Sequence, residues 1–535
     1  MSLGNKLTAF ALALAIILQI YYQISYVLQT SSAMPFMEPD NYMYLLFAQI
    51  ALNNTSLNTH TISNPYLIGA PKGFFEHPGL YQLPVLVARL TGLPLVWAFR
   101  LIQGFVILCI YLFVILFIKR VLDNTYLSKT WKNLAYTIGI TVPLLMQYTE
   151  IIEWRGSEFV ELLSLIMVYF LADLFNQKKE SGVLLDVAAI SLVLALGWWL
   201  WSGWPVLPVS LGLVALLGLG YKYLIANKPE RIRYVTIVFI IAIIFVFIFF
   251  KEVEFGFAWV LSAVGANGIA TVKELNPLGI GEVGGLNYSN GLFAVLAMLF
   301  FGAMALLAFL GKSYAIKDKQ NYEYLLALVV AMAIVLLPLA MTYIRLVSLA
   351  APYLAVLYGL GAVGFLTYFS KAGSNKITLS LTAFLFLIGN FVGSYMFYLS
   401  ATYLYHYANP QGLVGVGNYL KNYTNSTIFA YYGYGDWLEQ YAHVKVYTDT
   451  IQGLNLTIIE KYDKVFYANR SEACTLLQNI KPKPEFVLVS KAMLNVSLFA
   501  NATNQSIIRE PLSLDYCSKL VYNQSGFYLF SYGRL

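Results

Sequence analysis

The chain has 535 residues, of which 59% are hydrophobic and only 11% are charged. A soluble domain carries about 25% charged residues, so this chain has too little polar surface for a water-soluble globule and belongs to the membrane class. Its net charge of +7 is not a nucleic-acid signature, because the basic residues fall in short loops between apolar runs. We therefore expect membrane lipids, and no nucleic acid, among its partners.

About 20 apolar residues are needed to cross a bilayer, and the sequence predicts eleven such spans. They lie near 8–28, 97–118, 134–148, 159–176, 184–199, 203–221, 233–250, 291–310, 323–341, 345–368 and 377–399. The first is too long and too weakly bounded for a cleaved signal peptide and is expected to stay in the membrane. Glycines and prolines make 184–221 hard to divide, so the expected count is eleven to thirteen.

Basic loops alternate with loops that are nearly free of Lys and Arg, and this alternation predicts the orientation of the spans. Every second loop is basic: Lys119, Arg120, Lys129 and Lys132; Lys178 and Lys179; Lys222, Lys228, Arg231 and Arg233; Lys312, Lys317 and Lys319; Lys371 and Lys376. Because basic loops stay in the cytoplasm, we expect a multi-pass protein of the cell membrane with a cytoplasmic N-terminus. The long loops 29–96 and 251–290 then lie outside.

The composition changes near residue 400, which predicts a transmembrane catalytic domain over 1–400 and an extracytoplasmic domain over 401–535. Short strand-like runs at 428–430, 444–447 and 486–489 indicate a mixed α/β fold for the second domain. Cys474 and Cys517 both fall in it, in a compartment where a disulfide persists. The sequence alone does not decide whether they pair.

Asn-X-Ser/Thr triplets fall only in the regions that loop charge places outside. They begin at Asn53, Asn54, Asn287, Asn422, Asn425, Asn455, Asn469, Asn495, Asn501, Asn504 and Asn523. One interpretation is that Asn, Ser and Thr are common in polar loops. The other is that the host glycosylates these asparagines, making the chain a glycoprotein.

Ionisable side chains at membrane depth are costly and therefore indicate function. Four groups map to the predicted outer face: Glu38 and Asp40; Glu150, Glu153, Arg155 and Glu158; Lys273 and Glu274; Arg345. The first group by itself also suits an ordinary polar loop, and Arg345 also suits snorkelling to lipid headgroups. Carboxylates from separate loops suit Mg²⁺ or Mn²⁺, and an arginine suits a phosphate. These groups predict a metal-dependent reaction on a phosphorylated lipid.

The order of the short motifs resembles the catalytic subunit of oligosaccharyltransferase in its archaeal single-subunit form. Tyr431-Tyr432-Gly433-Tyr434-Gly435-Asp436-Trp437 stands where that family has WWDYG followed by an aromatic and hydrophobic run. Asp40 stands at the first-loop aspartate, Arg155-Gly156-Ser157-Glu158 at the second acidic motif and Thr271-Val272-Lys273-Glu274 at the last-loop TIxE or SVSE motif. Arg345 followed by Ala351-Pro352 resembles the segment whose arginine contacts the lipid pyrophosphate.

The resemblance implies a fold, an activity and a set of site residues. The fold is a polytopic α-helical membrane protein of the GT-C type with 11–13 spans and an extracytoplasmic mixed α/β domain. The activity is transfer of an oligosaccharide from a lipid-linked donor, on dolichyl or another polyprenyl phosphate or diphosphate, to asparagine of Asn-X-Ser/Thr in an acceptor polypeptide. The implied catalytic residues are Asp40, Glu274 and Arg345; the implied metal ligands are Asp40, Glu158, Glu274 and Glu153; Arg345 and Arg155 are implied at the lipid pyrophosphate; Tyr431, Tyr432, Asp436 and Trp437 are implied at the acceptor sequon.

The chain also departs from the family pattern. Tyr431 and Tyr432 replace the two tryptophans of WWDYG, and Gly433 replaces its aspartate. An alternative function therefore stays open: a related membrane glycosyltransferase that moves a polyprenyl-phosphate sugar to a different acceptor. A transporter or a non-catalytic glycan-binding relative ranks last, because the charges gather at one face rather than deep in the bundle.

Overall fold

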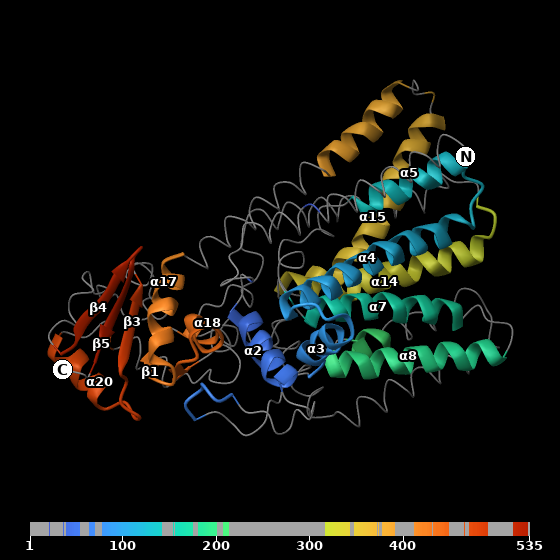
Figure 1. Ribbon diagram of the computed structural model, residues 1–535. Coiled ribbons are helices and arrows are strands. Elements are labelled where there is room, and N and C mark those ends of the chain that lie inside the picture. Colours follow the sequence, from blue (N-terminus) through green and yellow to red (C-terminus); the bar gives the residue numbers. More distant parts are fainter. Residues whose placement is uncertain are drawn as a thin grey trace.

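The computed structural model describes a large part of the chain (Figure 1). The described residues are 21, 36, 39–53, 64–69, 78–141, 154, 156–174, 180–200, 207–212, 316–342, 347–371, 373, 377–390, 411–430, 432–448, 465, 470–490 and 517–532. The predicted spans 8–28, 233–250 and 291–310 lie outside this part, apart from Tyr21. The predicted external loop 251–290 and the proposed domain boundary near residue 400 lie outside it as well.

Long helices form one layered bundle. They are α4 (Leu95–Leu122), α5 (Lys129–Ile140), α7 (Gly156–Leu174), α8 (Glu180–Leu200), α14 (Lys319–Thr342) and α15 (Val347–Lys371). Three stretches of the described part, Leu95–Leu122, Gly182–Leu200 and Leu349–Lys371, are long and apolar enough to cross a membrane. The predicted spans over these residues are confirmed as helices.

Helix α15 runs through the middle of this bundle. In its apolar window, 94% of the residues are buried, against 50% in α4. Gly359 of α15 faces Gly139 of α5, and a Cβ on Gly359 would lie 2.6 Å from the Ala135 carbonyl oxygen, so only glycine permits this approach. The outer surfaces of α4 and α8 instead expose leucines such as Leu101 and Leu192, which suits lipid contact.

Two helices lie in the segment that the sequence predicts as the first external loop. Helix α2 (Pro39–Asn53) packs against α3 (Gly79–Thr91), and α3 packs against α4. Helix α2 starts at Pro39, a residue favoured at the first helical position because its missing N–H has no intrahelical partner there. At 15 residues α2 is too short to span a bilayer, which is why a search for spans passes over it.

The C-terminal residues form a five-stranded mixed sheet with helices, in agreement with the predicted mixed α/β fold. Its strands are β1 (Thr427–Phe429), β2 (Lys445–Val446), β3 (Phe486–Ser490), β4 (Lys519–Gln524) and β5 (Phe527–Ser531). Their order is β2-β1-β3-β5-β4. The two pairs that involve β1 are parallel and the two that involve β5 are antiparallel. Helix α20 (Arg470–Gln478) carries Cys474, which forms a disulfide with Cys517 across a Cα–Cα distance of 6.0 Å.

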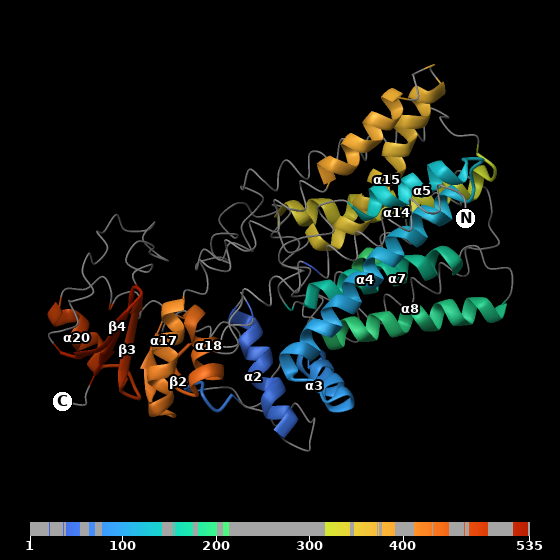
Figure 2. The same cartoon turned by 45° about the horizontal axis from the view of Figure 1, so that its top comes forward.

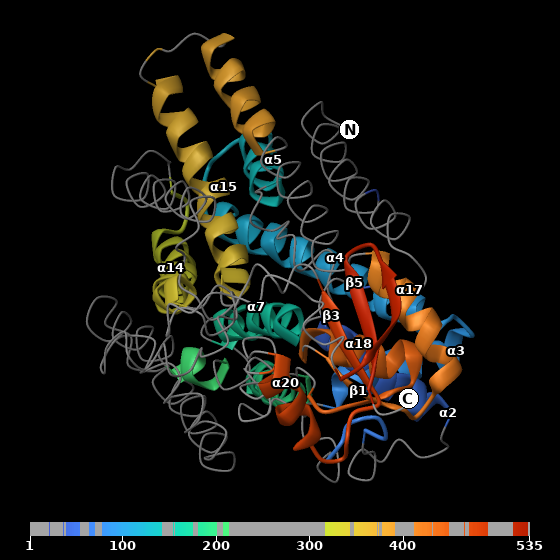
Figure 3. The same cartoon turned by 90° about the vertical axis from the view of Figure 1, so that its left-hand side faces the viewer.

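Two helices connect this sheet to the rest of the molecule. Helix α17 (Gln411–Leu420) packs on β4 and β5, and α18 (Tyr432–Ala442) packs on α17 and on α2. Figures 1 and 2 both place α17 and α18 between the sheet and α2, with the long helices beyond. Figure 3 shows the sheet in front of α18 when the molecule is viewed from that end. Among the described residues, α2 of the predicted first external loop therefore packs against a helix that adjoins the C-terminal sheet.

Candidate active site

The predicted site residues divide into those that the structure describes and those that it does not. Glu158, Asp436 and Trp437 are described with their side chains, and Asp40 and Tyr432 by their backbone. Outside the described part lie Glu153, Arg155, Glu274, Arg345 and Tyr431, whose roles stay predictions.

Asp40 lies in the first turn of α2, directly after Pro39. A carboxylate there is stabilised by the positive end of the helix dipole. The start of α2 is anchored to the preceding chain, because the Tyr42 hydroxyl donates a 2.6 Å hydrogen bond to the backbone oxygen of Phe36. From Asn41 to Ala48 every side chain of α2 is buried, so Asp40 belongs to a helix fixed along its first two turns.

Glu158 lies in the first turn of α7 and is 1% exposed. The amide Nε2 of Gln103, on α4, donates a 3.3 Å hydrogen bond to Glu158 Oε1. The guanidinium of Arg100 donates in turn to Gln103 Oε1 at 3.0 Å. A buried carboxylate is costly unless polar groups satisfy it, so this chain of donors holds Glu158 in place.

The same chain of contacts reaches the start of α2. The guanidinium carbon of Arg100 lies 5.0 Å from the centre of the Phe36 ring, within the range of a cation–π contact. Phe36 stands four residues before Asp40 and three before the first residue of α2. The contacts from Phe36 through Arg100 and Gln103 to Glu158 therefore join the start of α2 to the start of α7. These are the helices on which two of the predicted motifs stand.

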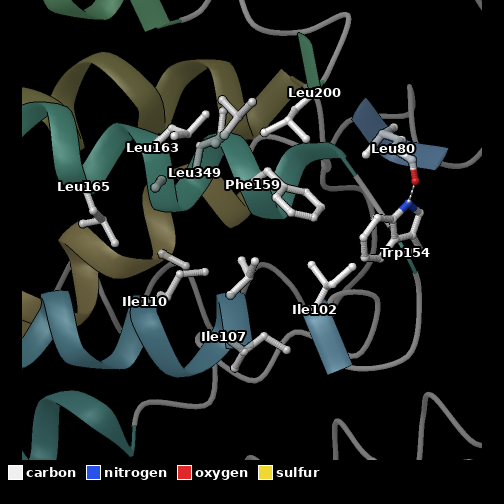
Figure 4. Packing of buried hydrophobic residues seen from close by; sticks show 14 of the residues in the cluster. Leu80, Ile102, Ile107, Ile110, Trp154, Phe159, Leu163, Leu165, Leu200 and Leu349 are labelled. Atoms are coloured by element: carbon white, nitrogen blue, oxygen red, sulfur yellow. Dashed lines mark hydrogen bonds between the residues drawn. The ribbon is translucent and has the colours of Figure 1, made fainter. Parts of the chain in front are cut away.

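Aromatic rings pack between the start of α7 and the neighbouring helices α3 and α4. Trp154 is 1% exposed and donates from Nε1 to the backbone oxygen of Leu80 at 3.0 Å (Figure 4). Its ring meets Phe99 of α4 edge-on at 4.7 Å and Phe159 of α7 at 5.1 Å. Trp154, just before α7, thus contacts both α3 and α4. These contacts position the start of α7, which carries Glu158 of the acidic motif.

Helix α18 carries Tyr432, Asp436 and Trp437 of the segment that stands at the WWDYG position. Asp436 and Glu439 are both 0% exposed and lie on one side of the helix, three residues apart. Trp437 stacks on Tyr441 at 4.7 Å, and a Cβ on Gly417 of α17 would lie 2.3 Å from its ring. Trp437 therefore packs between α17 and α18, and its contact with the acceptor stays a prediction.

Besides their direct packing, α2 and α18 are bridged by Asn64, a residue that the sequence analysis did not single out. Asn64 is 2% exposed, and its Nδ2 donates a 2.8 Å hydrogen bond to Glu439 Oε2. The same nitrogen lies 3.7 Å from the Met43 sulfur. Sequence positions 375 apart leave no local signal of such a contact. Arg100 and Gln103 had a signal, since both are polar side chains inside the predicted span 97–118.

A divalent metal ion is implied by the resemblance. Within the described ranges, no three Asp, Glu, His or Cys side chains gather into a cluster that fits a metal ion. Glu158 supplies one buried carboxylate of the hard type that Mg²⁺ and Mn²⁺ prefer. The side chains of the other implied ligands lie outside the described part.

No protein-family model matches this sequence, and no curated protein matches it either. Solved structures do match. The oligosaccharyltransferase AglB of Archaeoglobus fulgidus, in complex with an inhibitory peptide and a dolichol-phosphate, gives a TM-score of 0.67 at 13% identity, covering 100% of this chain and 75% of that one. The same organism's enzyme, tethered with an acceptor peptide containing the NVT sequon, gives 0.64 at 14% identity, with 98% and 74% covered.

A second kind of glycosyltransferase matches as well. ArnT of Cupriavidus metallidurans, bound to undecaprenyl phosphate, gives a TM-score of 0.52 at 12% identity and 97% coverage of both chains. At these identities the likeness is one of fold. The chain thus has the GT-C fold of these membrane proteins, with a C-terminal mixed sheet, as the sequence predicts.

Proposed function

We propose that this chain is a membrane glycosyltransferase that moves an oligosaccharide from a polyprenyl-phosphate-type carrier to asparagine in Asn-X-Ser/Thr. One observation carries the proposal: the likeness to the archaeal oligosaccharyltransferase extends over 100% of this chain, through the long helices and the C-terminal sheet. The contact between the starts of α2 and α7 supports it, since the motif order puts Asp40 and Glu158 on these two helices.

The alternative is transfer of a polyprenyl-phosphate sugar to another acceptor. Two observations favour it: Gly433 stands where the family has an aspartate, and ArnT matches over 97% of its own length. The higher TM-score of the oligosaccharyltransferase, 0.67 against 0.52, favours asparagine as the acceptor. An acceptor assay separates the two.

An amide nitrogen is a poor nucleophile because its lone pair is delocalised into the carbonyl. In the proposed reaction, Asp40 and Glu274 hold the acceptor amide and Asp40 takes its proton. The nitrogen then forms a bond to the anomeric carbon of the sugar while the bond from that carbon to the phosphate oxygen breaks. The electron pair of the broken bond leaves with the phosphate, whose charge Arg345 and Arg155 stabilise.

The proposed cofactor is Mn²⁺ or Mg²⁺, held by Asp40, Glu158 and Glu274, with Glu153 as a further candidate. When bound, it supplies Lewis-acid stabilisation of the leaving phosphate. Among these residues the described carboxylate, Glu158, is held by the amide of Gln103, the kind of outer contact that orients a metal ligand.

The acceptor-binding residues in this proposal are Tyr431, Tyr432 and Asp436, with Trp437 behind them. Asp436 stands three residues after the missing family aspartate, on the side of α18 that carries Glu439. The disulfide between Cys474 and Cys517 supports an extracytoplasmic position for the C-terminal domain, because disulfides persist in oxidising compartments.

The test uses membranes that contain this protein, a lipid extract of the host, Mn²⁺ and a fluorescent Asn-X-Thr peptide. We expect a gel shift that disappears with an Asn→Gln peptide, with EDTA and with Glu274→Ala. An extract that supports an oligosaccharyltransferase of known activity but gives no shift here contradicts transfer to asparagine. Labelled transfer from the lipid carrier to a non-peptide acceptor would then establish the alternative.

A further inference from the structure

The first external segment makes a second contact with the C-terminal domain besides the packing of α2 on α18. Residues 64–69, which we call the docking segment, lie along the free edge of β2. Val446 donates to the Tyr66 carbonyl oxygen at 2.8 Å, and Ile68 donates to the Val446 carbonyl oxygen at 2.9 Å. The docking segment thereby forms a parallel β-bridge, from Leu67 to Val446, at the edge of the sheet.

Side chains also stabilise the contact between the docking segment and the C-terminal domain. The Tyr66 ring stacks on the His443 ring at 5.2 Å, directly after the end of α18. Asn64 uses its whole amide: Oδ1 accepts from the Tyr66 backbone N–H at 2.9 Å, while Nδ2 donates to Glu439 and lies against Met43. A hydrogen bond to a carboxylate is stronger than one between neutral groups. The bond from Asn64 to Glu439 is thus the strongest polar contact that the structure describes between the docking segment and α18.

The position of this bond relates it to both proposed reaction partners. Met43 stands one helical turn after Asp40, about 4.5 Å along the axis at 1.5 Å per residue. Glu439 stands one turn after Asp436 and on the same side of α18. Asn64 therefore contacts α2 one turn after Asp40, at Met43. It contacts α18 one turn after Asp436, at Glu439.

We propose that Asn64 is a positioning residue for glycan transfer, which fixes α2 with Asp40 against the acceptor-binding side of α18 by bridging Met43 and Glu439. This role rests on the proposed function. The acceptor must touch both helices at once, its amide at Asp40 and its Ser or Thr at α18. A small displacement between the helices misplaces the amide, and displacements of about 1 Å cost enzymes up to about 100-fold in rate.

The test exchanges the polarity of the bond in the full-length protein. Asn64→Asp sets a carboxylate against Glu439, whereas Glu439→Gln added to it restores a bond, now donated from residue 439 to residue 64. For Asn64→Asp we expect kcat/KM for the acceptor peptide to fall about 10- to 100-fold, with the KM for the lipid donor unchanged. The double variant returns to within about 3-fold of the wild type if each exchange only reverses the bond.

Asn390→Asp is the matched control. Asn390 is 4% exposed and donates from Nδ2 to Thr141 Oγ1 at 3.0 Å, inside the helix bundle. Its exchange introduces the same charge at a similarly buried asparagine, and we expect kcat/KM for the peptide to stay unchanged per folded molecule. If Asn64→Asp does not accumulate, Asn64→Ser removes the bridge without adding a charge and carries the same expectation.

Three outcomes overturn the proposal. Unchanged kcat/KM in Asn64→Asp or in its serine substitute shows that the bridge does not position the helices. A loss that Glu439→Gln does not restore shows that the pair is not the cause. A wild-type protein without transfer to peptide overturns the proposed function itself, and with it this role.

Discussion

Gln103 Nε2 on α4 lies 3.3 Å from Glu158 Oε1 at the start of α7, so an amide from one helix orients the buried carboxylate of another. Arg100 holds the other end of the Gln103 amide at 3.0 Å. This arrangement leads to a prediction about a residue that has no counterpart in the short motifs.

We expect Gln103→Leu to lower transfer activity about 10- to 100-fold, because contacts of this kind change metal affinity or activity by that factor. The midpoint of activation by Mn²⁺ should rise in the same variant, which a titration of initial rates measures. Gln82→Leu is the control, since Gln82 also accepts a side-chain hydrogen bond, from Trp199 at 3.1 Å. An unchanged Mn²⁺ midpoint in Gln103→Leu would contradict the role given to Gln103.

A second prediction compares two buried carboxylates on one helix. Glu158 and Glu161 are each 1% exposed and stand three residues apart on α7. Glu158→Gln removes the charge of a proposed metal ligand, and we expect transfer to fall by at least about 100-fold, the scale on which charge stabilisation acts in active sites. Glu161→Gln removes an equally buried charge one turn deeper, and we expect most activity to remain. Equal losses in both variants would assign the effect to helix packing.

The fold was largely predictable because its signals are long and repeated. Apolar runs mark α4, α7, α8, α14 and α15, and each helix lies where a span is predicted. Helix α2 was not predicted because its 15 residues are too few for a membrane span. Pro39 followed by Asp40 is nevertheless a recognisable helix start. The hairpin of β4 and β5 also carried a signal, the Ser525-Gly526 turn between two strand-like runs.

The site was less predictable because its contacts join distant positions. The motifs name residues one at a time, whereas the bond from Asn64 to Glu439 joins positions 375 apart. A single sequence has no record of such pairs. Arg100 and Gln103 are different, because their polar side chains interrupt an otherwise apolar predicted span, and polar side chains inside a span indicate function.

A third prediction concerns the disulfide of Cys474 and Cys517. The bond closes a loop of sequence separation 43, and the loop-entropy relation gives about 4 kcal/mol of stabilisation for that length. We expect Cys474→Ser with Cys517→Ser to lower the urea midpoint for digestion of the C-terminal domain in pulse proteolysis. Dithiothreitol should lower the midpoint of the wild type in the same way. Cys109→Ser is the control, because Cys109 is a free thiol on α4; a midpoint insensitive to both treatments would show that the bond does not stabilise the domain.

A fourth prediction follows from Tyr447, directly after β2. Burial raises the pKa of Tyr447 above its ordinary value of about 10, the charge of Glu485 raises it further, and a hydrogen bond with Thr427 opposes both effects. The Tyr447 hydroxyl also donates to the Pro482 carbonyl oxygen. Because the folded protein keeps the neutral phenol more firmly than the unfolded chain does, the stabilisation is complete below pH 10 and is lost as the pH rises above it.

We therefore expect the urea midpoint of the C-terminal domain to fall as the pH rises from about 10 to about 11 in the wild type. Tyr447→Phe should start lower, by about 1 kcal/mol for the lost hydrogen bond, and should fall less steeply over that interval. Tyr441→Phe is the control, since its hydroxyl donates to Asn418 at an exposed position. If Tyr447→Phe and the wild type lose stability with the same slope, other groups cause the alkaline transition, because the slope counts the protons that unfolding releases.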